Sequence, residues 1–206
     1  MKRLVLIAIM VIWGPLSAHS TSVNLGASGS FLDQAVANPR DIFTITNTSA
    51  PGVQINSVTI DFDPASLFID TEAASGFPFT VDSGGLETGF NGVTGAVTGS
   101  TSLNLAFTAF DAGETFTFFV DIDDGSSNGI VEGSEFAGVT LQVTFVGSLI
   151  PDTPLSAAYQ ATGPFEATAQ IQSEIAAVPE PATVSLVVGG LLLLLGFRVA
   201  VRHKSR

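Results

Sequence analysis

Acidic side chains gather in one short segment of the chain, and their types and spacing are those of ligands for a hard cation. The segment ends a run of alternating residues, and its carboxylates are Asp121, Asp123, Asp124, Glu132 and Glu135. Carboxylate oxygens in a flexible, glycine-containing loop are typical ligands of Ca²⁺. Because side chains alternate along a strand, Asp121 and Asp123 are expected on the same face. The pattern indicates a calcium site between strands, with solvated surface acidity as the alternative interpretation.

This segment departs from the EF-hand, the helical calcium loop. Counted from Asp121, the first, third and twelfth positions carry the expected acids, the twelfth being Glu132. The fifth position is Gly125, however, and the sixth, where the sharp turn requires glycine, is Ser126. The flanking residues also alternate with the period of strands. Any calcium site here is therefore a loop on a β-scaffold.

A second predicted strand ends in the same way, at Asp61 and Asp63. If both strand ends lay at one pole of the fold, four aspartates would be neighbours, and their mutual repulsion would favour a divalent cation.

A pair of carboxylates in the central segment could still do acid–base catalysis. Residues 21–178 contain no histidine, lysine or cysteine, so a serine or threonine nucleophile has no such base. A carboxylate pair can hydrolyse glycosidic bonds, but the acids here are so numerous that no pair stands out. We therefore predict no catalytic residue and no enzyme, with a secreted glycan-active enzyme as the last-ranked alternative.

The charges of the chain are divided between its middle and its ends. The 206 residues include 7 basic and 19 acidic ones, a net charge of −12. All acids except Glu180 lie in residues 21–178, where Arg40 is the only base, so this segment carries 18 acids and a charge of −17. Such a segment repels phosphate backbones, which excludes nucleic-acid binding. The chain also lacks cysteine, so disulfides and thiolate metal sites are excluded.

The first 20 residues have the three parts of a secretory signal. Two basic residues precede an apolar run of ten residues, and a glycine–proline pair and small residues follow. Ten residues are too few to span a bilayer, which needs about 20. We predict a signal peptide over residues 1–20, cleaved after Ala18 or after Ser20.

The last residues have the pattern of a membrane anchor with a basic end. Residues 182–201 are mostly apolar and, as a helix, would reach about 30 Å, which is enough to span the membrane. The basic residues of this end are Arg198, Arg202, Lys204 and Arg206. By the positive-inside rule they stay cytoplasmic, so the acidic segment is predicted on the outer side. A short motif that its prolines hold extended precedes the helix: Val178, Pro179, Glu180 and Pro181.

This C-terminal arrangement resembles the PEP-CTERM sorting signal of Gram-negative bacteria. The Pro-Glu-Pro motif, the glycine-containing apolar helix and the basic end occur in that family's order over residues 178–206, although the basic residues are interspersed. The stretch from Phe110 to Asp123 is also similar to one in uncharacterised ectodomains of this family.

The resemblance implies recognition by exosortase, a membrane-embedded enzyme similar to cysteine proteases. The protein would be held at the inner membrane by its helix, cleaved near Pro-Glu-Pro and moved to the cell surface or the extracellular space. A structural or interaction role linked to exopolysaccharide and biofilm is then expected. A calcium-binding adhesion module is the alternative function.

Two further features bear on glycans. Sugar-stacking platforms generally use tryptophan or tyrosine, and residues 21–178 contain only Tyr159 of these types. The phenylalanines of the predicted strands are expected in the core. Asn47, Thr48 and Ser49 form an N-glycosylation sequon, which we interpret as accidental in a Gram-negative host.

Alternating apolar and polar residues dominate the middle of the chain. The clearest predicted strands cover residues 58–62, 103–107, 115–122 and 139–145. Shorter ones are predicted at residues 43–47, 53–55, 67–69, 77–81 and 165–171. Residues 111–114 are predicted as a hairpin turn between two of these strands.

Seven to ten short strands predict an all-β fold, an antiparallel β-sandwich of immunoglobulin-like or jelly-roll type. We expect this ectodomain over residues 21–160. A last strand and linker would follow at residues 161–178, and the sorting signal at residues 179–206.

Overall fold

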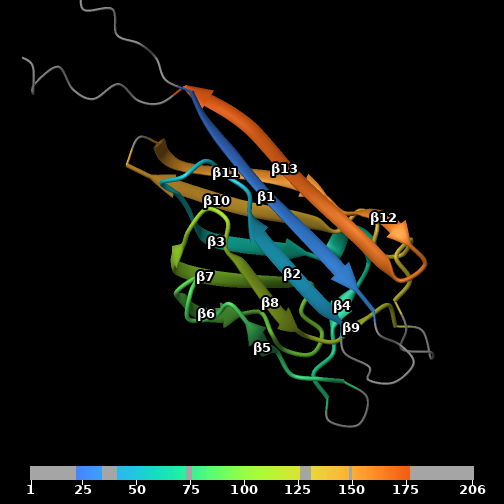
Figure 1. The fold of residues 1–206 in the computed structure, drawn as a ribbon. Coiled ribbons are helices and arrows are strands. Elements are labelled where there is room, and N and C mark those ends of the chain that lie inside the picture. Colours follow the sequence, from blue (N-terminus) through green and yellow to red (C-terminus); the bar gives the residue numbers. More distant parts are fainter. Residues whose placement is uncertain (1–21, 34–40, 73–75, 126–130, 149, 177–206) are drawn as a thin grey trace, which may run out of the picture. The chain divides into compact units, whose positions relative to one another are not determined.

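The computed structural model describes residues 22–33, 41–72, 76–125, 131–148 and 150–176, all within one compact unit, Ser22–Val178 (Figure 1). The predicted signal peptide, the sorting motif and the C-terminal helix lie outside the described residues. Within the described residues, no helix has the length and apolar character needed to cross a membrane.

The described residues form an all-β fold, as predicted. A single short 3-10 helix, Asp63–Ala65, accompanies the strands in these residues. The strands are β1 (Ser22–Leu32), β2 (Ile42–Asn47), β3 (Val53–Asp61), β4 (Phe68–Ile69), β5 (Thr80–Ser83), β6 (Phe90–Thr94), β7 (Ser102–Phe110), β8 (Thr115–Phe119), β9 (Ile122–Asp123), β10 (Thr140–Gly147), β11 (Ile150–Ala158), β12 (Gln160–Gly163) and β13 (Glu166–Ala176).

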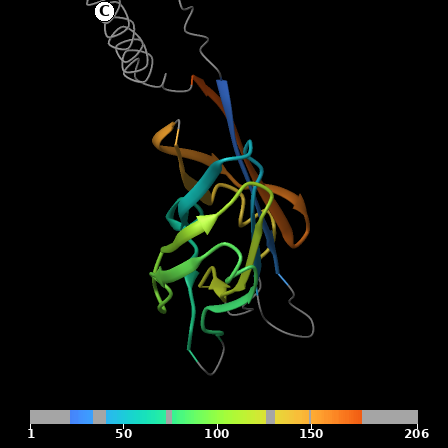
Figure 2. The same cartoon turned by 60° about the vertical axis from the view of Figure 1, so that its left-hand side comes forward.

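The strands pair into three antiparallel sheets. The six-stranded sheet has the order β12-β13-β1-β2-β8-β5, and the five-stranded sheet has the order β11-β10-β3-β7-β6. The short strands β4 and β9 form a third sheet. Figures 1 and 2 both show β13 running beside β1 over the length of the two strands. The range predicted to hold a last strand and linker thus contributes two strands, β12 and β13, to the six-stranded sheet.

The predicted hairpin turn at residues 111–114 is present as a turn but does not form a hairpin. It joins β7 of the five-stranded sheet to β8 of the six-stranded sheet, so the two strands that it connects do not pair. The turn is held by the end of β2 instead. Gly113 N–H donates to the carbonyl of Asn47 at 2.7 Å, and Asn47 N–H donates to the carbonyl of Glu114 at 3.1 Å. The connection therefore crosses from one sheet to the other.

Both large sheets contribute their inward side chains to one hydrophobic core. The alternation seen in the sequence is also the alternation of burial: in β7, for example, Leu103, Leu105 and Phe107 are buried, while Asn104 and Ala106 are exposed. Phenylalanine rings fill much of the core. The rings of Phe31, Phe43, Phe62, Phe116, Phe118 and Phe136 are fully buried and contact one another in a continuous network.

Candidate cation site

Three buried aspartates converge where several strands end. Asp33 follows β1, Asp41 precedes β2, and Asp121 stands between β8 and β9, with exposed fractions of 7%, 3% and 7%. Two further carboxylates act on them electrostatically, Asp70 directly after β4 and Asp123 in β9. The pairing of β4 with β9 brings Asp70 close to Asp121 and Asp123. We call these five residues the aspartate cluster.

Backbone hydrogen bonds hold two of the buried carboxylates in place. Oδ2 of Asp41 accepts the N–H of Ile122 at 2.7 Å. Oδ2 of Asp33 accepts the N–H of Val131 at 3.0 Å. Because N–H donors compensate part of the cost of burying a charge, these bonds help to explain how carboxylates can lie so deep. The aspartates on either side of residues 34–40 therefore connect β1 and β2 to the chain around β9.

Burial and repulsion raise the pKa values of two residues of the cluster, Asp121 and Asp41. Burial raises the pKa of Asp121 to about 7, and the charges of Asp70, Asp123 and Asp33 add to this increase. Burial also raises the pKa of Asp41 well above its usual range, with further repulsion first from Asp33. These effects favour the protonated forms of Asp121 and Asp41.

The cluster should make the domain less stable as the pH rises from 5 to 8. A carboxylate with a raised pKa in the fold binds its proton more tightly in the folded than in the unfolded chain, so stability falls as the pH rises through the folded-state value. We expect a loss of about 2 kcal/mol in the free energy of unfolding, after allowing for solvent screening. Urea denaturation at a series of pH values without divalent cations measures it.

A matched pair of variants assigns this pH dependence. Asp121→Asn should reduce the loss of stability between pH 5 and pH 8, because the amide does not titrate; Asp41 still contributes to the profile. Asp152→Asn, at an exposed position of the edge strand β11, should leave the profile unchanged. Equal profiles for wild type and Asp121→Asn would contradict the assignment.

The residues predicted as calcium ligands divide into two groups. Asp121 and Asp123 belong to the aspartate cluster, and half-buried Asp124 follows them in the chain. Oδ1 of Asp123 accepts the N–H of Gly125 at 2.8 Å, which fixes the turn after β9. In the described residues, no three histidine or acidic side chains form a group that could hold a metal ion.

Glu132 and Glu135, the other two predicted ligands, are exposed and bond within their own turn. Oε2 of Glu135 accepts the N–H of Glu132 at 2.8 Å, and the hydroxyl of Ser134 donates to Oε2 of Glu132 at 3.4 Å. These hydrogen bonds show that the two glutamates stabilise their own turn.

Asp61 and Asp63 are not among the carboxylates that shift the pKa values of the cluster. Oδ1 of Asp61 accepts the N–H of Asp63 at 3.2 Å, and both residues line an open groove over the five-stranded sheet together with Thr59 and Gln142. The second strand end that contributes to the cluster is the one at Asp70.

Sequence reasoning missed Asp33, Asp41 and Asp70 as members of the cluster. Each of them stands next to a pair of apolar strand residues, as Asp41 does before Ile42 and Phe43. An aspartate directly at a strand end was therefore the available signal. That signal does not identify which strand ends meet, because their proximity depends on the sheet topology.

Comparison of the chain with protein-family models, with curated proteins and with solved structures gives no match.

Proposed function

We propose that the protein is an exported cell-surface or extracellular-matrix protein, sorted by exosortase through residues 178–206. In this proposal it passes through the inner membrane, is anchored there by residues 182–201 and is then released to the cell surface or the matrix. It acts as a structural or interaction protein linked to exopolysaccharide and biofilm, without catalytic activity of its own.

We further propose that the two large sheets form a β-sandwich of immunoglobulin-like or jelly-roll type. Support comes from the inward faces of β2 and β8 on one sheet and of β3, β7 and β10 on the other, which supply one core. A sandwich suits a display role because its outer faces and its loops are free to make contacts while the core holds them in place.

The observation that carries the sorting proposal is the order of Pro-Glu-Pro, apolar stretch and basic end after a segment of charge −17. The described strands begin with β1 at Ser22 and end with β13 at Ala176, between the two predicted processing sites. Ser22 and Ala176 are register partners. Cleavage at either predicted site would therefore leave every described strand intact.

Fractionation of host cells tests the sorting proposal. A Pro179→Ala, Glu180→Ala double variant should accumulate in the inner membrane and fall at least tenfold at the surface, as should the wild type in a host lacking exosortase. Glu174→Ala, which removes the nearest acid of the described sheet, is the control and should reach the surface normally. Normal surface arrival of the double variant would overturn the proposal.

The second candidate function is a calcium-binding adhesion module. The observation that favours it is the aspartate cluster, in which three carboxylates are buried and neighbouring aspartates add to the raised pKa values of Asp121 and Asp41. Calcium would relieve the repulsion that the cluster imposes on the fold. Binding only to the folded state stabilises it by RT ln(1 + [Ca²⁺]/Kd), about 1.4 kcal/mol at ten times the dissociation constant.

Thermal melts at pH 8 with 10 mM Ca²⁺ and with chelator test this candidate. Calcium should raise the melting temperature of the wild type and of the Glu132→Gln control. The Asp41→Asn variant, which removes a cluster carboxylate, should lose the increase. Equal melting temperatures of the wild type with calcium and with chelator would reject a calcium site.

A further inference from the structure

The outward face of the six-stranded sheet carries uncharged polar side chains in register. The longest row crosses all six strands and consists of Gln160, Thr168, Ser30, Thr44, Thr117 and Ser83. The next row consists of Gln170, Ser28, Thr46 and Thr115. Strand geometry spaces such side chains about 4.8 Å apart across strands and about 6.8 Å apart along each strand. We call this regular array of hydroxyl and amide groups the hydroxyl face.

The hydroxyl face is neutral although the domain is strongly acidic. Along β13 the outward positions alternate with buried ones, and three neutral residues (168, 170 and 172) lie between Glu166 and Glu174. The two rows contain no carboxylate, while residues 21–178 contain 18. The described residues contain no base either. An acidic partner would therefore meet a negatively charged domain whose described residues offer no base to bind it.

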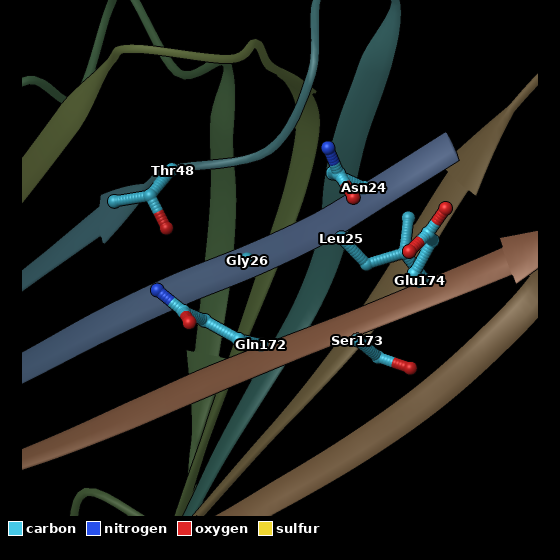
Figure 3. Close-up of a pocket in the computed structure, with 7 residues that line it drawn as sticks. All are labelled: Asn24, Leu25, Gly26, Thr48, Gln172, Ser173 and Glu174. Atoms are coloured by element: carbon cyan, nitrogen blue, oxygen red, sulfur yellow. The ribbon is translucent and has the colours of Figure 1, made fainter. Parts of the chain in front are cut away.

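A groove continues the hydroxyl face at its third row. Gly26 of β1 and Gln172 of β13 are register partners there, and the absence of a side chain at Gly26 leaves a hollow over the strand. The groove encloses about 510 Å³ and is also lined by Asn24, Thr48 and Glu174. In Figure 3 the amide of Gln172 extends from β13 toward Gly26, with Thr48 on the far side of β1.

Glycine is required at the floor of this groove. A Cβ atom on Gly26 would lie 2.5 Å from the hydroxyl oxygen of Thr48. The Gly26 N–H donates to the Ser49 hydroxyl at 2.9 Å, and that hydroxyl donates to the Gly26 carbonyl at 3.0 Å. The loop after β2 is therefore fixed against the glycine and forms a rigid wall of the groove.

We propose that the hydroxyl face and its groove bind a neutral polysaccharide. The proposal rests on the proposed surface or matrix role and names the class of partner. Hydroxyl and amide groups both donate and accept hydrogen bonds, as sugar hydroxyls do, whereas an anionic polymer needs cationic donors. The regular spacing of the face suits a ligand that repeats, and many weak hydrogen bonds along a chain can replace the missing tryptophan platform.

The outward face of the five-stranded sheet is less suited to binding a neutral polysaccharide than the hydroxyl face is. Its groove contains Asp61 and Asp63 beside Thr59 and Gln142, so two carboxylates accompany its polar groups, compared with one, Glu174, in the groove at Gly26. The comparison supplies a matched control, because Gln142 and Gln172 are both exposed glutamines on outward positions of a central strand.

Native affinity electrophoresis of the full chain in mild detergent tests the proposal. The probes are dextran and hydroxyethyl cellulose, which are neutral, and alginate, which is acidic. We expect at least one neutral polymer to retard the protein and alginate not to do so. Gln172→Glu should weaken the retardation about fivefold, the equivalent of one lost hydrogen bond, whereas Gln142→Glu should leave it unchanged.

Each other result overturns the proposal. The proposal is wrong if neither neutral polymer retards the protein or if alginate retards it equally. It is also wrong if Gln172→Glu leaves the retardation unaltered or if Gln142→Glu has an equal effect. Slow migration in gels without polymer, caused by self-association, would likewise contradict it. Circular dichroism of each variant verifies folding, and both substitutions change an exposed side chain without changing its size. The assay uses purified protein, so it can fail while sorting by exosortase holds, and the reverse is equally possible.

Discussion

Replacing Asn47 by alanine should lower the free energy of unfolding by about 4 kcal/mol. Asn47 is fully buried at the end of β2, and its side-chain amide donates to the carbonyls of Val53 at 3.1 Å and of Phe110 at 2.9 Å. Its Oδ1 accepts the N–H of Ser49 at 3.1 Å. Those three groups would lose their partner in the variant, and each unsatisfied buried group costs about 1–3 kcal/mol. The side chain joins the six-stranded sheet to β3 and β7 of the other.

Urea denaturation of Asn47→Ala and Asn24→Ala checks this prediction. Asn24 is exposed at the start of β1, so its replacement should change the free energy of unfolding by less than about 0.5 kcal/mol. Similar losses for the two variants would show that Asn47 does not connect the sheets.

The burial of Asn47 has a second consequence, since an amide that donates both hydrogens inside the fold is unavailable for glycosylation. Asn47 therefore has a structural role, and its sequon is not a glycosylation site.

Phe43→Ala should be equally damaging, with a loss of about 4 kcal/mol. The ring of Phe43 has no exposed surface and packs at centroid distances of 5.0 Å on Phe118 and 5.3 Å on Phe31. It also contacts Phe62, directly after β3, and Phe136, so its removal leaves a cavity between the two sheets. Neighbouring rings are rigid and held by their own contacts, so they cannot close this cavity fully.

The control for Phe43→Ala is Phe165→Ala, at a ring that is 39% exposed in the turn before β13. Its replacement should cost less than about 1 kcal/mol, because water already reaches the ring. Chemical denaturation of both variants measures the difference. If Phe165→Ala lost as much stability as Phe43→Ala, the network of phenylalanine rings would not be the centre of the core.

Strands with a strict period of two were predictable from the sequence. Residues 103–107 and 139–145 alternate because one face of the strand packs in the core, and both ranges lie within or overlap a strand, β7 or β10. The predicted strand 115–122 is interrupted in the structure, since β8 ends at Phe119 and β9 begins at Ile122. This break places Asp121 between the two strands, where its side chain belongs to the aspartate cluster.

β1 was not predictable in the same way, because it contains small residues where a strand normally has large apolar ones. Gly29 lies on its inward face, and a Cβ atom there would clash with the hydroxyl of Tyr159. Packing of this tyrosine, which is fully buried, therefore requires glycine in a strand that otherwise has low β-propensity. Pairing with β13 along eleven residues compensates for the weak local preference.

The topology of the connections could not be predicted from local pattern. The residues at positions 111–114 are typical of a tight turn, and a tight turn usually joins paired strands. Whether the chain continues in the same sheet depends on the distant partners of β7 and β8, which are β3 and β2. The same limitation separated Asp33 and Asp41 from Asp121 in the sequence analysis, although these residues share one cluster.

Mass spectrometry of the mature protein from a host that has exosortase tests the account most directly. The account predicts an N-terminus at His19 or Thr21, after removal of the signal peptide, and a C-terminus near residues 178–181, with the basic tail absent. The mature protein would then consist of the central segment with its charge of −17, without the signal peptide and without the basic tail. An intact chain ending at Arg206 would contradict sorting by exosortase and leave a simple membrane anchor.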